Sequence, residues 1–190
     1  MLTERAPRRV ALRSEFARSD LLLTLAAPQD ERLRELAKLM AVALKEGVVP
    51  DLQRLCREFL NVAAEFYEVE KPGILVLAAR PLRVREGGWA TELFGDYSPQ
   101  TLLIRVWMRT AIRKQVTSFG TFLSTLCHEF CHHLDYQRFK FPDSWYTRGF
   151  YERTAALYHH SRGTPQKPLV WVKAPGGIWR IDWQRTRQGG

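Results

Sequence analysis

The chain has 190 residues, of which 45% are hydrophobic and 26% charged. This balance excludes a chain that is disordered throughout, and the length suffices for one domain with a sizeable core. The longest apolar run near the start, residues 21–27, is too short to span a bilayer, and Asp20 directly before it argues against a signal peptide. We therefore expect a cytoplasmic protein without a membrane partner.

The net charge of +9 is concentrated at the two ends of the chain. Residues 1–18 contain five Arg and two Glu, a net +3, and residues 161–190 contain six Lys or Arg and one Asp, a net +5. The central part carries the remaining +1. The basic ends therefore say little about chemistry in the centre. They do make a nucleic acid an expected partner of the protein.

The first third of the chain predicts an arm followed by two helices. Residues 1–19 lack a helical period and are interpreted as a basic N-terminal arm. Apolar residues recur at helical spacing over residues 30–44, and Gly47 followed by Pro50 predicts the end of that helix. A second helix is predicted from Asp51, a plausible N-cap, to about residue 66.

The pattern then becomes extended. Residues 73–79 form a short apolar run typical of a buried strand, and the Glu-Gly-Gly sequence at 86–88 predicts a turn into a strand over residues 89–94. Residues 95–100 are interpreted as a loop. Residues 101–109 alternate between an apolar face and a mixed face, which predicts another strand.

Two further helices and a hairpin complete the expected fold. One helix is predicted from Thr117 or Ser118 to about Tyr136, and the next from about Asp143 to Arg162. The tail, residues 168–183, reads as a hairpin that turns at Pro-Gly-Gly. Helices, then strands, then helices predict an α+β fold. We expect a basic arm (1–19), a central domain (20–163) and a basic, Trp-rich C-terminal hairpin (164–190).

The central motif is H-E-x-x-H, formed by His128, Glu129 and His132. On a helix, residues four apart lie about 40° apart around the axis and about 6 Å apart along it, so both imidazoles can share one ion. Glu129 is offset by about 100°, which lets its carboxylate reach a metal-bound water instead. This geometry predicts His128 and His132 as metal ligands and Glu129 as the catalytic base.

The residues around the motif support a buried helix that lines a cleft. All five histidines fall within residues 128–160, and the face opposite the motif is apolar. His133 lies nearer that apolar face and is interpreted as structural. Cys127 and Cys131 are interpreted as small buried side chains rather than ligands, and the odd number of cysteines, three, fits a reducing compartment.

A catalytic zinc site needs three protein ligands and an open position. Glu152, on the following predicted helix, is our candidate for the third ligand. Its neighbours on the same stripe are Gly149, Ala155 and Ala156, and such small residues would let the two helices approach closely. Zn²⁺ is therefore the expected cofactor.

These residues resemble the gluzincins, the thermolysin-like zinc peptidases with HExxH, a nineteen-residue spacer and a ligand Glu on a later helix. The resemblance covers about residues 73–160 and is strongest to the minigluzincins. It implies a zincin-like fold, in which a small mixed sheet packs on an active-site helix and a glutamate helix. It also implies a zinc metalloendopeptidase that hydrolyses peptide bonds of a peptide or protein substrate, which lies along the strand at 101–109.

Full-sized gluzincins carry a further His or Tyr that stabilises the oxyanion. His159, on the stripe of Glu152, is our first candidate for this catalytic role, and Tyr146, Tyr158 and His160 are alternatives. Asp135, one turn after His132, is a candidate to hydrogen-bond a ligand imidazole.

A rival interpretation is a nucleic-acid-associated protein that uses an inactive zinc fold as a scaffold. The tryptophans and four of the basic residues of the tail favour it, since aromatic and cationic side chains together suit single-stranded nucleic acid. These residues are Lys173, Arg180, Arg185 and Arg187. The alternative is that the tryptophans pack the tail onto the core and the arginines keep it soluble.

Overall fold

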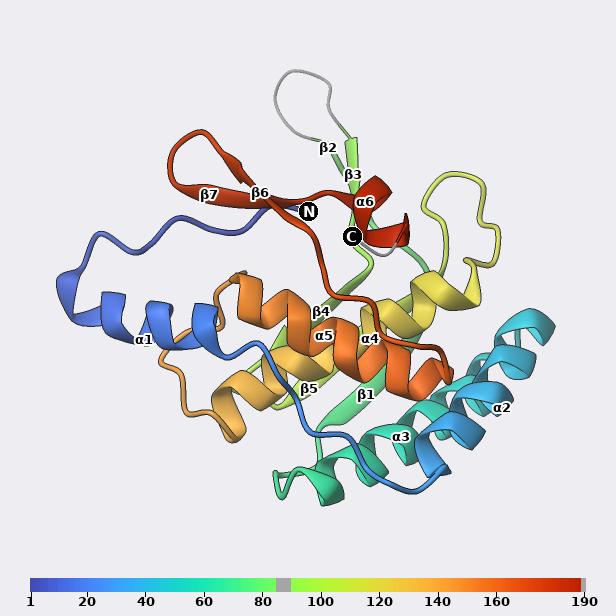
Figure 1. Ribbon diagram of the computed structural model, residues 1–190. Coiled ribbons are helices and arrows are strands. Elements are labelled where there is room, and N and C mark those ends of the chain that lie inside the picture. Colours follow the sequence, from blue (N-terminus) through green and yellow to red (C-terminus); the bar gives the residue numbers. More distant parts are fainter. Residues whose placement is uncertain (85–89, 189–190) are drawn as a thin grey trace.

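The computed structural model describes residues 1–84 and 90–188, and within them the chain forms a mixed α+β fold (Figure 1). The helices are α1 (Val10–Leu21), α2 (Arg32–Glu46), α3 (Val49–Phe66), α4 (Phe119–Gln137), α5 (Arg148–Arg162) and α6 (Trp183–Gln188). The strands are β1 (Gly73–Ala79), β2 (Leu82–Val84), β3 (Ala90–Glu92), β4 (Gly95–Ser98), β5 (Leu103–Arg109), β6 (Trp171–Ala174) and β7 (Ile178–Ile181). None of the described helices combines the length and hydrophobicity needed to cross a bilayer.

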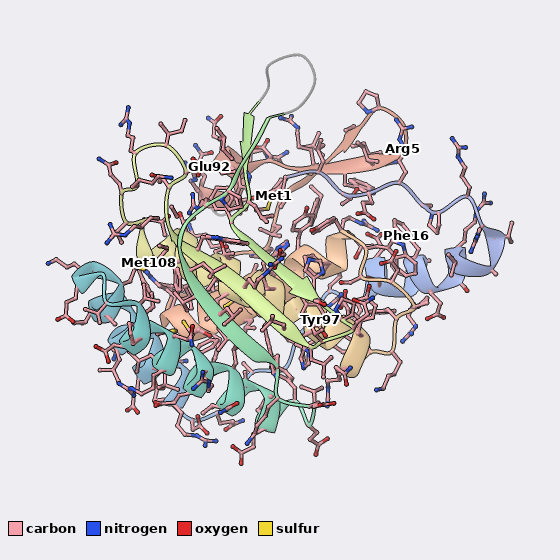
Figure 2. The ribbon with its side chains drawn as sticks, turned by 180° about the vertical axis from the view of Figure 1, so that it is seen from behind. Met1, Arg5, Phe16, Glu92, Tyr97 and Met108 are labelled. Carbon is pink, nitrogen blue, oxygen red and sulfur yellow. The ribbon has the colours of Figure 1, made fainter. Side chains whose placement is uncertain are left out.

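The main sheet has the strand order β1-β5-β4, with β1 parallel and β4 antiparallel to β5. Its buried face carries Ile74, Val76, Ile104 and Val106, which join the core formed with α3 and α4. Seen from behind, the sheet lies in front of α4 (Figure 2). The opposite face carries Leu75, which is 40% exposed. The helices therefore cover one face of the sheet, and α4 is held firmly against it.

The structure confirms two predicted strands and corrects the region between them. β1 matches the predicted run at 73–79, and β5 falls within 101–109 with the expected apolar face buried. The interpretation of 95–100 as a loop is wrong, because β4 covers Gly95–Ser98. Gly and Asp are poor strand formers, but pairing with β5 overrides that preference, and Asp96 accepts from Arg105 across the pair at 2.7 Å.

This pairing also corrects the expected substrate edge. β5 is bonded on both sides, so the strand at 101–109 offers no free edge to a peptide. The edge strand on that side is β4. The predicted turn at 86–88 lies outside the described residues, whereas β3 falls inside the predicted strand at 89–94.

The helices follow the prediction with shifted starts. Gly47 ends α2 in the left-handed conformation, with φ of 75°, and α3 begins at Val49, so Pro50 lies in its first turn, where a missing N–H costs nothing. Ser118 caps α4 by accepting from the backbone N–H of Thr121 at 3.2 Å. The last helix, α5, starts at Arg148 rather than near 143, because Thr147 caps it.

Both ends of the chain contain structure that the sequence did not predict. Part of the arm is helical, as α1, and Leu2 forms a bridge with Arg180 of β7. The predicted hairpin is confirmed as β6 and β7, but Trp183 begins α6 instead of continuing β7. The Asp182 side chain accepts from the backbone N–H of Arg185 at the start of α6, a capping signal that was present in the sequence.

Candidate metal centre

The helix α4 presents His128 and His132 on consecutive turns, with their Nε2 atoms 3.2 Å apart. The ring planes are inclined by 84°, so the two nitrogens converge from different directions. The face of α4 opposite the two histidines is buried as predicted, with side chains that are at most 1% exposed. Because this face packs on the core, the histidines lie on the side of α4 that faces away from the core. The residues of the buried face are Phe122, Leu126, Phe130 and Leu134.

A hydrogen-bond chain sets the tautomer of His132. The Ser144 hydroxyl donates its proton to Asp135 Oδ2 at 2.7 Å. Ser144 Oγ also lies 2.7 Å from His132 Nδ1, and since its own proton is already used, it accepts from that nitrogen. Nδ1 therefore carries the ring proton, and the lone pair of His132 is on Nε2, directed towards His128. Ligand histidines in metalloproteins are commonly oriented in this way.

Asp135 is itself anchored by Arg153 on α5, whose guanidinium donates to Asp135 Oδ1 at 2.7 Å. The two side chains are 1% and 0% exposed. The predicted role of Asp135 is thus present in an indirect form, through Ser144. Neither Ser144 nor Arg153 could be recognised from the sequence, because nothing local links them to the motif.

Both histidines are held in the neutral state that metal binding requires. Burial lowers the pKa of His128 to about 4. Burial and then His128 lower the pKa of His132 to about 3. Two unprotonated, converging ring nitrogens suit a shared divalent cation of the zinc class, so these two residues fit the predicted cofactor.

Glu129 lies beside this pair with 6% exposure and lines the same cavity as His128. Burial, followed by the charge of Asp96, raises the pKa of Glu129 to about 8. Gly95 at the start of β4 makes room for it, since a Cβ there would lie 2.9 Å from the Glu129 carboxylate. No local pattern in the sequence indicates this close approach between α4 and β4.

Tyr146 is the candidate that the structure brings to the histidines. Its ring centroid lies 5.5 Å from that of His128 and 5.3 Å from that of His132. Burial and then the charge of Glu129 raise its pKa to about 12, so the phenol keeps its proton at neutral pH. Tyr146 belongs to the loop before α5, which also contains Ser144. This short loop therefore contacts the histidines through both the Tyr146 ring and the Ser144 hydroxyl.

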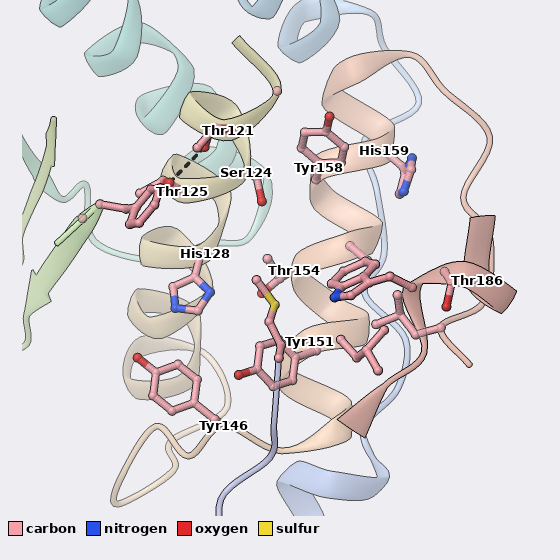
Figure 3. Close-up of a pocket in the computed structure, with 18 of the residues that line it drawn as sticks. Thr121, Ser124, Thr125, His128, Tyr146, Tyr151, Thr154, Tyr158, His159 and Thr186 are labelled. Atoms are coloured by element: carbon pink, nitrogen blue, oxygen red, sulfur yellow. Dashed lines mark hydrogen bonds between the residues drawn. The ribbon is translucent and has the colours of Figure 1, made fainter. Parts of the chain in front are cut away.

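The structure keeps the other candidates away from the histidines. His159 and Tyr158 line the far end of the same cavity, while His128 and Tyr146 lie at the near end (Figure 3). His159 Nδ1 lies 2.8 Å from the Thr164 hydroxyl, which ties the ring to the end of α5. His160 does not belong to the lining of this cavity.

Glu152 points to the C-terminal hairpin, where its Oε1 accepts from Trp171 Nε1 at 3.0 Å. No group of three or more His, Cys, Asp or Glu that could hold a metal occurs in the part of the chain that the structure describes. The close approach expected at Gly149 exists, but it is to α1, since a Cβ there would lie 2.1 Å from the Ser19 carbonyl oxygen. The ligand role of Glu152 therefore stays a prediction.

Three further residues of the motif helix, His133, Cys127 and Cys131, are structural. His133 is fully buried, and its Nε2 donates to the Glu70 carbonyl at 2.7 Å while its Nδ1 accepts from the Tyr97 hydroxyl at 3.0 Å. Cys127 and Cys131 are buried free thiols, and burial raises the pKa of both. These observations match the interpretation of all three as parts of the core.

The candidate metal centre opens into a cavity of about 960 Å³ between α4, α5, the start of β4 and the C-terminal segment. Its walls include Glu92, Phe94 and Gly95 on one side and Tyr151 and Ala155 on the other. This volume is at the upper end of the range for small-molecule pockets, so several residues of a peptide would fit.

Comparison with known proteins assigns no relative to the chain. No family model, no curated protein and no solved structure matches it. The geometry of the site and the motif itself are therefore the features that bear on function.

Proposed function

We propose that the protein is a zinc-dependent metallopeptidase, in which His128 and His132 bind the metal and Glu129 is the general base. One observation carries the proposal: the Nε2 atoms of the two histidines converge to 3.2 Å, with the His132 proton held on Nδ1, beside a buried carboxyl group. Each of these three features serves hydrolysis, and a purely structural helix needs none of them.

When bound, zinc supplies Lewis acidity, which polarises a peptide carbonyl and makes water more acidic. Glu129 takes a proton from the attacking water and delivers it to the leaving amine. In the metal-free site burial raises the pKa of Glu129 to about 8, so the carboxyl needs the nearby cation to release its proton; the buried carboxylate that results is then a stronger base than an exposed one. The Tyr146 phenol keeps its proton and donates a hydrogen bond to the carbonyl oxygen as negative charge develops there.

The outer edge of β4 is the proposed binding surface for the substrate backbone. β4 is bonded to β5 on one side only, and its first residue, Gly95, lines the cavity next to Glu129. An extended peptide that adds to such an edge forms main-chain hydrogen bonds irrespective of its sequence. The peptide would then cross the site in front of Glu129.

The test is zinc content measured together with hydrolysis of a quenched fluorescent peptide library. Glu129→Gln is expected to retain zinc and lose turnover, whereas His128→Ala is expected to lose zinc. Ser124→Ala, which alters a residue of the same cavity wall, is the matched control and should keep both properties. Retained hydrolysis in Glu129→Gln, or unchanged zinc in His128→Ala, would remove the proposed roles.

A second candidate is the nucleic-acid-associated protein with an inactive zinc site. The observation that favours it is that the two basic ends meet: Arg5 lies against Gly176 in the hairpin turn, and Leu2 forms a bridge with Arg180. A nucleic acid would then contact charge from both ends of the chain at once.

A salt-dependent gel shift with single-stranded DNA tests this candidate. Lys173→Glu with Arg180→Glu should abolish the shift, because both side chains are exposed and charge reversal there leaves the core intact. The matched control is Arg54→Glu on the exposed surface of α3. An equal shift in the two variants would contradict a role for the hairpin.

A further inference from the structure

The first five residues form an extended segment beside the cavity, here called the N-terminal segment (residues 1–5). Leu2 pairs with Arg180 in an antiparallel bridge. Around this bridge, the backbone N–H of Thr3 donates to the Trp179 carbonyl at 2.8 Å, and that of Ile181 donates to the Met1 carbonyl at 3.2 Å. The N-terminal segment thus pairs with the edge of β7 through an isolated antiparallel bridge and two flanking backbone hydrogen bonds.

The other side of the N-terminal segment contacts the walls of the metal centre. The Tyr151 hydroxyl donates to the Leu2 carbonyl at 3.1 Å, and the backbone N–H of Glu4 donates to the Tyr146 carbonyl at 2.8 Å. Met1 lines the same cavity as His128 and Glu129. An extended piece of polypeptide therefore already lies next to the proposed catalytic residues, held by main-chain hydrogen bonds as a peptide ligand would be.

The N-terminal segment buries few of its side chains against the rest of the protein, so it is attached weakly. Met1 and Leu2 are 57% and 51% exposed, and Thr3 is the buried residue of the set at 7%. Hydrogen bonds, including one from the Trp179 backbone to Thr3 Oγ1 at 2.8 Å, supply most of the attachment. The net contribution of a hydrogen bond is similar in size to the entropy lost when one residue is ordered. A competing peptide can therefore displace the segment.

We propose that the N-terminal segment is a built-in, displaceable occupant of the peptide-binding cleft, so that the described arrangement is a self-inhibited form. A substrate peptide on the edge of β4 needs the part of the cavity that Met1 lines beside His128 and Glu129, so it competes with the segment for that space. Removal of the segment also frees the loop that carries Tyr146, since the bond from the Glu4 N–H to the Tyr146 carbonyl is lost. The inhibition depends on the proposed peptidase function, whereas the occupancy of the cleft does not.

The experiment compares the zinc-loaded full chain, a variant without residues 1–5, and the full-length variant Thr3→Pro. Proline removes the N–H that bonds Trp179 and the hydroxyl oxygen that accepts from it. Leu2→Ala is the matched control, because it truncates a half-exposed side chain and keeps the backbone groups. Hydrolysis of a quenched fluorescent peptide is measured, together with binding of the synthetic peptide MLTER by tryptophan fluorescence.

Removal of the segment and Thr3→Pro are each expected to raise kcat/KM at least tenfold, with the full chain and Leu2→Ala alike. MLTER should bind and inhibit the shortened chain at least tenfold more tightly than the full chain, where it must first displace the tethered segment. Equal hydrolysis by all variants without MLTER binding overturns the proposal and leaves the peptidase function standing.

If no variant hydrolyses peptide but MLTER still binds the shortened chain, the peptidase function fails and the occupancy of the cleft is supported. Absence of both hydrolysis and binding rejects both. Circular dichroism shows whether the shortened chain folds. If it does not, the rate at which added MLTER replaces the segment is measured in Thr3→Pro and is expected to exceed that in Leu2→Ala. An unchanged rate relative to Leu2→Ala would overturn the proposal.

Discussion

Arg153 and Asp135 form a buried ion pair between α5 and α4, with Nη2 and Oδ1 2.7 Å apart. Arg153 also donates to the carbonyls of Ser19 and Leu22 at the end of α1. One side chain therefore joins three helices and, through Asp135 and Ser144, fixes the orientation of a proposed metal ligand. The stability of the fold and the geometry of the site depend on the same contact.

Asp135→Ala is expected to destabilise the protein by about 3–5 kcal/mol, because it leaves the Arg153 charge buried without its partner. Urea unfolding of the metal-free protein measures this change. The double variant Asp135→Ala with Arg153→Met should recover part of the loss, since no unpaired charge remains. A loss below about 1 kcal/mol in the single variant would show that the pair is not important for stability.

Ser144→Ala is expected to weaken zinc binding about 10–100-fold with little effect on unfolding, because His132 loses the acceptor that holds its Nδ1 proton. Competition with a chromophoric chelator measures the affinity. Ser124→Ala, a serine on the cavity wall, serves as the control. Equal affinities in the two variants would mean that the ring orientation is fixed by packing alone.

Tyr146→Phe and Glu152→Gln separate the two oxygen-bearing candidates near the site. Tyr146→Phe should lower kcat about 100-fold with zinc content retained, since a donor to the developing oxyanion is lost.

Glu152→Gln should leave zinc affinity unchanged, because its carboxylate is bonded to Trp171 and not directed at the histidines. A tenfold or larger loss of zinc affinity in Glu152→Gln would instead support the ligand role that the gluzincin resemblance implies.

Glu129 should make the metal-free protein less stable as the pH rises. Its pKa is raised from 4.5 to about 8 by burial, so its contribution to folding is full below about 4.5 and is lost as the pH rises through 8. Glu129→Gln removes this loss, and at pH 9 it should exceed the wild type in free energy of unfolding by a few kcal/mol at most, on the order of 1.4 kcal/mol per pKa unit. Urea titrations at pH 5 and pH 9 in the presence of a chelator test this.

The exposed residue Glu35 provides the control for that comparison. Glu35→Gln should follow the wild type at both pH values. A Glu129→Gln variant that also follows the wild type at pH 9 would contradict a raised pKa for Glu129 in the folded, metal-free protein.

The sequence by itself determined the elements whose signals are local. The helix of the H-E-x-x-H motif, its apolar face and its Ser118 cap follow from residues a few positions apart, as do β1, β5 and the hairpin turn. The convergence of His128 and His132 belongs to this group, because the pitch of a single helix sets it. The structural role of His133 was also evident from its side of the helix.

Only the tertiary structure decided which distant groups meet that helix. β4 forms in a Gly-Asp stretch because β5 offers a partner, and Ser144, Tyr146 and Arg153 reach the site because α5 packs across α4. Glu152 shares its helix with Arg153 but points to Trp171, since adjacent residues on a helix lie about 100° apart. Spacing along the chain fixes what lies within one helix, whereas partners on other elements depend on packing angles that no local pattern contains.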